Sequence, residues 1–280
     1  MVAPKGREVK ASVILATYNQ PAKLAASLYS LSKQSEKDFE IVIADDGSRD
    51  ETRRLIEEFR RVSRTELVHE WQDDEGFRKA RILNASIRKA RSTKLVFMDG
   101  DTFAHKDFIK DHLEALETAD VFLGRRVMLG PDASRMVEND PSLMGTPEFW
   151  ILAIASTFFK KTPTKHLNRG LRLPAWLRSF LKYDRVPDLI GCNFSATKAA
   201  LLKVNGFDEA HVGYGNEDGD LYIRLRNSGA RIAGSKCYAV QWHLWHQERS
   251  FKPGAETLYN ERLANDRSSV SCSDGLEKFS

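Results

Sequence analysis

Two short apolar runs decide the fold of this chain, SVILA at Ser12–Ala16 and IVIA at Ile41–Ala44. Both are continuously apolar and rich in β-branched residues, which is typical of strands covered on both faces in a parallel sheet. Between them, Leu24, Leu28 and Leu31 repeat at the spacing of one helix face. The order strand, helix, strand predicts a βαβ unit.

The same alternation continues toward the carboxyl terminus. A helical pattern over 55–62 is followed by a strand pattern over 66–71, and a helix over 80–90 leads to an apolar strand over 94–98. We therefore expect a doubly wound, mostly parallel α/β sheet with helices on both faces.

The hydrophobic pattern blurs in the middle of the chain. Residues 130–188 hold six of the nine prolines and show no clear period, which indicates an insertion or a connecting region. Regular patterns return with helices expected near 198–204 and 218–227 and a strand near 231–240. The last residues are rich in serine and charge and are expected to be frayed.

The composition is that of an ordinary globular protein, with 280 residues of which 41% are hydrophobic and 29% charged. The net charge of +4 falls well short of a nucleic-acid-binding composition, so no nucleic-acid partner is expected. Cys192, Cys237 and Cys272 are odd in number and far apart, which indicates neither a disulfide framework nor a zinc knuckle. A reducing cytosol is therefore the expected compartment.

The amino-terminal residues contain no apolar segment as long as that of a signal peptide, so secretion is not expected. The most apolar stretch, 149–159, has eleven residues, whereas a membrane-spanning helix needs about 20. A basic and aromatic mixture over 160–181 follows it and suits a bilayer surface. A buried segment beside a solvated basic loop is the alternative. We expect a cytoplasmic protein and keep peripheral membrane contact as one of these two interpretations.

Polar residues follow the predicted strands at the points where the strands end: Thr17-Tyr18-Asn19, Asp45-Asp46-Gly47-Ser48 and Asp99-Gly100-Asp101. Ligands of doubly wound sheets bind beyond the carboxyl ends of the strands, so these groups are expected to meet in one crevice. Two carboxylates around a glycine suit a hard cation such as Mg²⁺ or Mn²⁺, and a nucleoside diphosphate complements such a cation. Asp-Gly-Asp is also an ordinary turn sequence.

Two histidines, His243 and His246, lie just beyond the last predicted strand. Imidazole binds Mn²⁺ as well as Zn²⁺, so either histidine could complete a coordination shell begun by Asp101. Histidines between tryptophans, as in QWHLWHQ, are also common as packed groups.

An acidic elbow, GYGNEDGD at 213–220, precedes a predicted helix. One acid in a first helical turn is explained by capping and by the helix dipole. Three acids after flexible glycines indicate more, because such a loop can present a carboxylate into a cleft as a general base. Asp218 is the residue that we expect in this role.

Taken together, these residues resemble the family 2 glycosyltransferases of the GT-A fold. The similarity covers about residues 10–125 and rests on SVILATYN at 12–19, IVIADDGS at 41–48, GFRKAR at 76–81 with Asn84, and Asp99-Gly100-Asp101. Three later segments look like the carboxyl-terminal galactosyltransferase-type part of chondroitin polymerases, β-1,4-galactosyltransferases and polypeptide N-acetylgalactosaminyltransferases: GCNFS at 191–195, GFDE at 206–209 and GYGNED at 213–218. Tyr214 and Asn216 depart from that pattern, in which tryptophan and glycine are usual.

The resemblance implies a metal-dependent inverting enzyme that moves a hexose or N-acetylhexosamine from a UDP-sugar to a hydroxyl of a glycan or lipid-linked acceptor. Asp101 and His246 would hold Mn²⁺ or Mg²⁺, with Asp99 and His243 as neighbours. Asp218 would deprotonate the acceptor, and Glu217 would orient it. Contacts to the nucleotide sugar are implied for Thr17, Tyr18, Asn19, Asp46, Arg78, Arg81, Asp99 and Gly100.

The resemblance also implies one compact, Rossmann-like GT-A domain. A nucleotide-sugar-binding half would span 1–125, and a variable insertion facing membrane or acceptor would span 126–190. An acceptor and catalytic half would span 191–262, followed by a flexible tail over 263–280. Because the chain is short and shows no signal peptide, we expect the product to be a bacterial-type surface polysaccharide of the cell envelope, such as lipopolysaccharide.

Other classes of protein remain as alternatives. A sugar-nucleotidyltransferase would carry a glycine-rich basic loop near the amino terminus, and the segment from Thr17 to Lys23 has no glycine. A glycosidase would need two carboxylates around a sugar and no nucleotide. A nucleotide-sugar or glycan-binding protein without turnover would keep the same fold.

Overall fold

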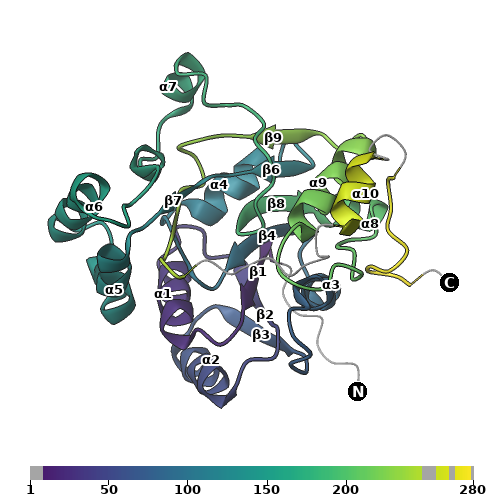
Figure 1. Cartoon of the computed structure of the whole chain (residues 1–280), viewed down its shortest axis with the longest axis horizontal. Helices are drawn as coiled ribbons and strands as arrows, with labels where there is room; N and C mark the ends of the chain where they lie inside the picture. Colours follow the sequence, from purple (N-terminus) through teal and green to yellow (C-terminus); the bar gives the residue numbers. More distant parts are fainter. Residues whose placement is uncertain (1–8, 248–256, 265–268, 279–280) are drawn as a thin grey trace.

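The computed structural model describes residues 9–247, 257–264 and 269–278. A twisted central sheet runs through the molecule, and helices cover both of its faces (Figure 1). The predicted doubly wound α/β sheet is confirmed by the strand order β3-β2-β1-β4-β8-β6-β9. Its strands are β1 (Ala11–Thr17), β2 (Phe39–Asp45), β3 (Glu66–Trp71), β4 (Lys94–Asp99), β6 (Val121–Leu123), β8 (Asn193–Thr197) and β9 (Ile232–Gly234).

Four parallel strands, β1 to β4, form the part of the sheet that the sequence predicts. Every residue of β1 and β2 is buried, which explains why both runs are continuously apolar. The register pairs Thr17 with Asp45 and Ala16 with Asp99, so three strands end at one edge. The strand β8 joins antiparallel to β4 and β6 and extends the sheet beyond this half.

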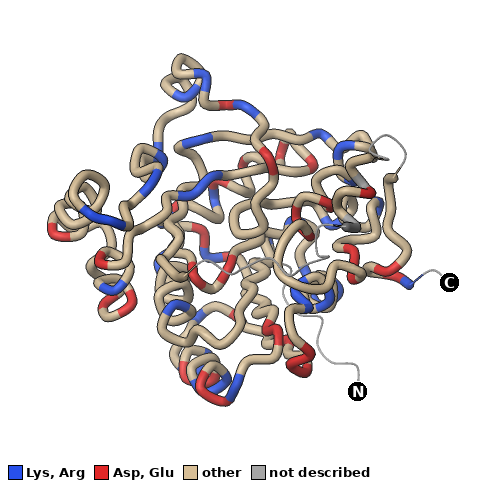
Figure 2. Tube along the Cα trace, in the orientation of Figure 1, with Lys and Arg blue, Asp and Glu red and all other residues tan. Residues whose placement is uncertain are grey.

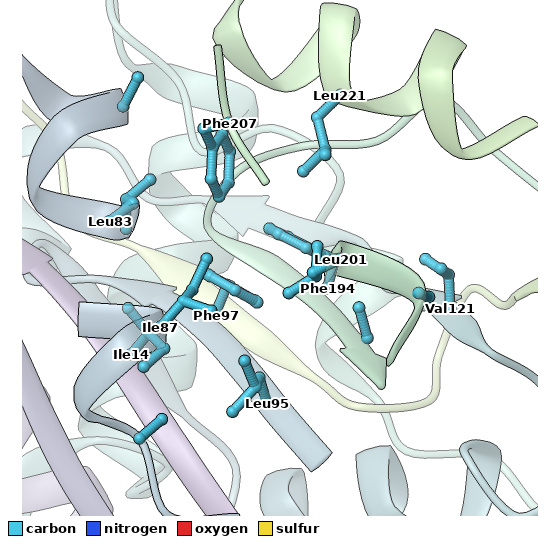
Figure 3. Packing of buried hydrophobic residues seen from close by; sticks show 14 of the residues in the cluster. Ile14, Leu83, Ile87, Leu95, Phe97, Val121, Phe194, Leu201, Phe207 and Leu221 are labelled. Carbon is cyan, nitrogen blue, oxygen red and sulfur yellow. The ribbon is translucent and has the colours of Figure 1, made fainter. Parts of the chain in front are cut away.

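Two hydrophobic cores lie on the two faces of the sheet. On one face, Phe97 and Phe194 stack with ring centroids 4.2 Å apart, and Phe207 packs edge-on against Phe97 (Figure 3). The helices α3 (Lys79–Lys89), α8 (Lys198–Lys203) and α9 (Glu217–Asn227) cover this face. The other face packs against α1 (Pro21–Ser32), α2 (Asp50–Val62) and α4 (Phe108–Ala115). Packing on both faces of the sheet therefore fixes the positions of the strand ends.

The strand expected near 231–240 is instead two short strands in different sheets. After β9 the chain leaves the central sheet, and β10 (Gln241–His243) pairs with β5 (Thr102–Ala104) and β7 (Arg126–Met128) in a second sheet. Cys237 and Ala239 adopt positive φ angles of 61° and 48°, which a continuous strand cannot contain. Side chains of Asp111 and Asn193 bind the backbone N–H and C=O of Ala239 and stabilise this crossing.

The proline-rich middle of the chain is more regular than the sequence predicts. It contains α5 (Pro131–Asn139), α6 (Pro147–Phe159), α7 (Ala175–Phe180) and the short 3₁₀ turns η1 (Pro141–Leu143) and η2 (Leu167–Gly170). Three of its prolines stand in the first turn of a helix, where the missing N–H costs nothing. Helices α5 and α6 bury a third core with β10, which includes Phe149, Ala153 and Trp242.

The flexible tail expected over 263–280 needs correction. Residues 269–278 pack against the body of the protein, and Cys272 and Leu276 are buried. The side-chain amide of Asn205 donates to the carbonyl oxygens of Cys272 and Glu277. These hydrogen bonds hold a segment that forms neither a helix nor a strand of the sheets. The helix α10 (Thr257–Ala264) packs against α9, while residues 265–268 and 279–280 lie outside the described residues.

No helix among the described residues has both the length and the apolar character needed to cross a bilayer.

Candidate active site

The carboxyl ends of β1, β2 and β4 border a pocket that contains about 770 Å³ of empty space, open solvent included. Gly100 donates its backbone N–H to the carbonyl of Ala16, and a Cβ on this glycine would lie 3.1 Å from that oxygen. The turn after β4 is therefore pressed against β1, which aims Asp99 and Asp101 into the pocket.

Three side chains in this pocket form a cluster that can hold a metal ion: Asp101, His243 and His246. One carboxylate oxygen of Asp101 lies 3.5 Å from His243 Nε2, and the other lies 3.3 Å from His246 Nε2. The candidate ligand atoms all lie within 4.8 Å of one another. The cluster forms because β10 lies beside β5, and the N–H of Leu244 donates to the carbonyl of Asp101.

The chemistry of this cluster fits a divalent cation. Asp101 Oδ1 and His243 Nδ1 are buried and have no hydrogen-bond partner among the described residues. Burial alone would raise the pKa of Asp101, but the hydrogen bond and the positive charge of His246, whose own pKa this contact raises, hold it below its usual value, so the carboxylate is charged. Burial lowers the pKa of His243, which favours the neutral imidazole that ligates metals. One carboxylate and two imidazoles form a donor set that holds divalent first-row transition metals.

Asp46 lies in the same pocket, on the side of β2. Its carboxylate accepts hydrogen bonds from Gln72 Nε2 at 2.5 Å and from the backbone N–H of Arg78 at 3.0 Å. Burial raises the pKa of Asp46 above its usual value. Thr17 and Tyr18 line the pocket beside it. The structure thus places these residues, which were predicted to contact the nucleotide sugar, in one pocket with Asp99, Gly100 and the cluster of Asp101, His243 and His246.

Three other predicted contacts are not brought into the pocket by their side chains. Asn19, with a φ of 50°, accepts a hydrogen bond from the backbone N–H of Arg49 and shapes the turn after β1. Arg81 is exposed and forms an ion pair with Glu75 at 3.2 Å. Arg78 contributes its backbone N–H to Asp46, and its side chain does not line the pocket.

The acidic elbow starts α9 close to the pocket. Gly213, Gly215 and Asn216 have positive φ angles, and the N–H of Gly213 donates to the carbonyl of Phe77. The ring of Tyr214 therefore meets the ring of Phe77 edge-on, at 5.7 Å, and both rings line the pocket. Glycine adopts positive φ angles without strain, so Gly213 and Gly215 allow the tight loop that leads into the first turn of α9.

Asp218 and Glu217 flank the pocket without belonging to its lining. The two oxygens of Asp218 accept the backbone N–H groups of Gly191 and Gly219, at 2.9 and 2.8 Å. Glu217 is buried, and burial raises the pKa of its carboxyl above the usual value. A carboxyl group with a raised pKa is closer to the value that a general base needs at neutral pH, so Glu217 meets one requirement of that role.

Two cations at this site were not expected from the sequence. Lys79 Nζ lies 2.9 Å from Asp99 Oδ1 and 3.8 Å from Glu217 Oε1. Burial alone would lower the pKa of Lys79, but the two carboxylates raise it well above its usual value. Lys79 therefore links Asp99, at the end of β4, to Glu217, at the start of α9.

The second unexpected cation is Arg126 in β7, which lines the pocket. Its Nη1 lies 2.7 Å from the sulfur of Cys192, and Asp99 and Asp101 contribute to the raised pKa of its guanidinium. No local pattern marks Arg126, because β7 enters the site through pairing with β10. Lys79 stands in an ordinary amphipathic helix, and the motif GFRKAR that contains it is the part of the sequence that could have pointed to it.

Replacing Lys79 by methionine should destabilise the protein by about 3 kcal/mol, because two largely buried carboxylates would lose their shared cation. The raised pKa of Lys79 means that its contribution is complete below the usual lysine value of 10.5 and is lost as pH rises through the higher value of the folded protein. The loss measured by urea unfolding should therefore be the same at pH 7 and pH 9.

The matched control is Lys89→Met, at the exposed carboxyl end of the same helix. This exposed change should alter the free energy of unfolding by less than about 0.5 kcal/mol. Equal effects of the two substitutions would show that the ion pairs of Lys79 contribute nothing to stability.

Comparison with known proteins places the chain in a family. Residues 12–203 match the family described as glycosyl transferase family 2, and residues 172–247 match the one described as N-terminal domain of galactosyltransferase. The validoxylamine A glucosyltransferase of Streptomyces hygroscopicus subsp. jinggangensis is 28% identical over 242 residues, which cover 80% of this chain and 53% of that protein. The chondroitin synthase of Pasteurella multocida is 25% identical, over 81% of this chain and 24% of that protein. The chain thus spans about half the length of the first of these relatives and a quarter of the second.

Solved structures share the fold. Staphylococcus aureus TarS in complex with UDP-GlcNAc superposes with a TM-score of 0.56 at 18% identity, over 86% of this chain and 60% of that one. The mannosyltransferase PcManGT from Pyrobaculum calidifontis, in complex with GDP-Man and Mn²⁺, gives a TM-score of 0.58 at 16% identity, over 93% of this chain and 62% of that one. The predicted GT-A fold is confirmed by these neighbours. Since the first family match covers more than two thirds of the sequence, this chain belongs to glycosyl transferase family 2.

Proposed function

We propose that this glycosyltransferase moves a hexose or N-acetylhexosamine from a UDP-sugar to a hydroxyl group, with inversion and with the help of a divalent cation. One observation carries the proposal: the cluster of Asp101, His243 and His246 opens into the same pocket as Asp46 and Asp99. A metal site, a buried carboxylate and a second acid around one cleft are the parts that displacement of a nucleoside diphosphate requires.

The donor half of the pocket supports a nucleotide. Asp46 keeps acceptor capacity beyond its two hydrogen bonds, because a carboxylate offers about four lone-pair sites. We propose that Asp46 accepts the N–H of a uracil ring, with Thr17 and Tyr18 beside it. Asp99 would face the ribose, and its ion pair with Lys79 fixes its direction. The complexes of TarS with UDP-GlcNAc and of PcManGT with GDP-Man are consistent with a nucleotide sugar here.

The metal would be Mn²⁺ or Mg²⁺, held by Asp101, His246 and His243. A cation bound there would supply charge neutralisation for the diphosphate leaving group. Arg126 places a further positive charge in the same pocket, which also favours the anionic diphosphate.

Asp218 would take the proton of the acceptor hydroxyl. The backbone N–H groups of Gly191 and Gly219 hold its carboxylate in one orientation, which general-base catalysis needs. Glu217 would orient the acceptor sugar from the neighbouring position. A single displacement by the activated hydroxyl inverts the anomeric carbon, so an α-linked donor would yield a β-linked product. The acceptor would be a glycan or a lipid-linked sugar of a bacterial-type surface polysaccharide.

A screen of UDP-sugars for release of UDP, with and without Mn²⁺, tests this function. At least one donor should release UDP in the presence of Mn²⁺, and chelation of the metal should stop the release. Pyrophosphate formation from a nucleoside triphosphate and a sugar phosphate would indicate a nucleotidyltransferase instead. Binding of UDP without release from any donor would indicate a non-catalytic binding protein.

A further inference from the structure

The helix α6 exposes an apolar stripe to solvent. Ile151, Ile154 and Phe158 lie at positions i, i+3 and i+7, and their side chains are 68%, 47% and 73% exposed. The opposite face of the helix holds the buried Phe149 and Ala153, which anchor it to the third core. A helix that is apolar on both faces can bury one face in its own protein and the other against a partner.

A second apolar group surrounds α7. Leu171, Trp176 and Phe180 are 56%, 71% and 80% exposed. Figure 1 shows α7 standing beyond the body of the molecule and α6 at the outer side of the same part of the chain, away from the central sheet. Large apolar side chains at the tip of a projecting element are unusual on a monomer and mark an interaction site.

The charge of this part of the chain is uniformly positive. Residues 149–183 contain seven of the 43 Lys and Arg residues and none of the 39 Asp and Glu residues. Figure 2 shows the blue segments along it, with red only at its margins. Lys161, Lys165, Arg169 and Lys182 form no ion pair with any carboxylate in the described part of the chain. These four charges remain available to an external partner.

The other cations of the segment attach it to the body. Arg172 binds both oxygens of the buried Asp111 in α4, and Arg178 lies over the ring of Tyr238 at 4.1 Å. Lys165 forms backbone hydrogen bonds in both directions with Met128 of β7. The exposed surface is therefore held on a fixed base that adjoins a strand of the active-site pocket.

We infer that residues 151–182 form a docking surface for an anionic lipid bilayer. Aromatic and aliphatic tips enter the interface of a bilayer, and lysines among them meet anionic headgroups. A second copy of the chain would place these four available positive charges against four others, so self-association does not match this surface. Docking would hold the pocket near the bilayer, and, if the proposed function holds, would present it to lipid-linked acceptors.

Sedimentation with vesicles tests the inference on the full chain. Binding to vesicles of phosphatidylcholine with 30% phosphatidylglycerol should be at least tenfold stronger than binding to pure phosphatidylcholine, and 0.5 M salt should weaken it. The triple variant Phe158→Ser, Trp176→Ser, Phe180→Ser should reduce binding to the anionic vesicles at least tenfold. Reversal of Lys161, Lys165 and Lys182 to glutamate should do the same.

The control replaces Val62, which is 81% exposed, by serine. Val62 belongs to α2, which lies at the end of the molecule opposite to α7 (Figure 1). This variant should bind vesicles as the wild type does. Equal binding to charged and neutral vesicles, or unchanged binding by both triple variants, would overturn the inference. A mass in solution that doubles with concentration and is reduced by the serine variant would overturn it in favour of a second copy.

The outcome is separable from that of the proposed function. Release of UDP without vesicles needs no bilayer, so the serine variant should keep it at the level of the wild type. A protein that binds vesicles but releases no UDP would contradict the proposed function alone.

Discussion

Asp101→Ala should abolish sugar transfer at every Mn²⁺ concentration. Among the described residues, Asp101 is the one carboxylate within 4 Å of both histidines, so its removal takes away the charged ligand of the proposed metal site. Charge stabilisation by a metal is worth several kcal/mol, and about 1.4 kcal/mol corresponds to tenfold in rate, so kcat/KM should fall roughly 10³-fold or more. The measurement is UDP release from the active donor over a range of Mn²⁺ concentrations.

Binding of the metal can be followed without activity. A ligand that binds only the folded protein raises its melting temperature, so Mn²⁺ should stabilise the wild type and leave Asp101→Ala unchanged. Asp73→Ala is the matched control, since Asp73 is exposed and lies outside the pocket. It should keep both the activity and the response to Mn²⁺. Full activity of Asp101→Ala at high Mn²⁺ would remove this residue from the metal site.

Asp218→Asn should lose turnover while donor binding persists. Asparagine keeps the size of the side chain and one acceptor oxygen for the backbone N–H groups that hold it, but it cannot accept a proton from the acceptor hydroxyl. Loss of a general base costs typically 10² to 10⁴-fold, and kcat of transfer should fall by roughly that factor. The affinity for UDP, measured by calorimetry in the presence of Mn²⁺, should change less than about twofold, because Asp218 does not line the donor pocket.

The neighbouring acid provides the discriminating control. Glu217→Gln should raise the KM of the acceptor more than it lowers kcat, because Glu217 is proposed to orient the acceptor. If Glu217→Gln instead removes kcat and Asp218→Asn retains it, the two roles are exchanged and the assignment of the base is wrong. The comparison is needed because the raised pKa of Glu217 brings its carboxyl group, too, closer to the value that a general base needs.

The parts of the site that could be predicted are those close to one another in sequence. The strand ends after β1, β2 and β4 each carry their polar residues within a few positions, and the topology of a doubly wound sheet brings such ends together. Asp46, Asp99 and Asp101 therefore lie where the sequence predicts. Asn19 and Arg81 stand in the same motifs, yet their side chains bind Arg49 and Glu75 instead, because a motif specifies position along the chain and not the direction of a side chain.

Local periodicity was a weaker guide in the second half of the chain. The crossing from β9 to β10 depends on Asp111 and Asn193, which are far from Ala239 in sequence and bind its backbone. Prolines indicated irregular structure, although two of them begin the helices α5 and α6, whose apolar residues are buried in one core with α1 and β10. In both cases a contact distant in sequence decided a local conformation.

Hydrophobic repeats and residue order alone were enough to specify a parallel α/β sheet, an acidic turn at the end of its fourth strand and a pair of histidines near the carboxyl end. The meeting of Asp101 with these histidines required pairing of β10 with β5 across more than a hundred residues. Lys79 and Arg126 likewise became part of the pocket through packing, since the energy of a buried charge depends on which opposite charges surround it and not on its neighbours along the chain.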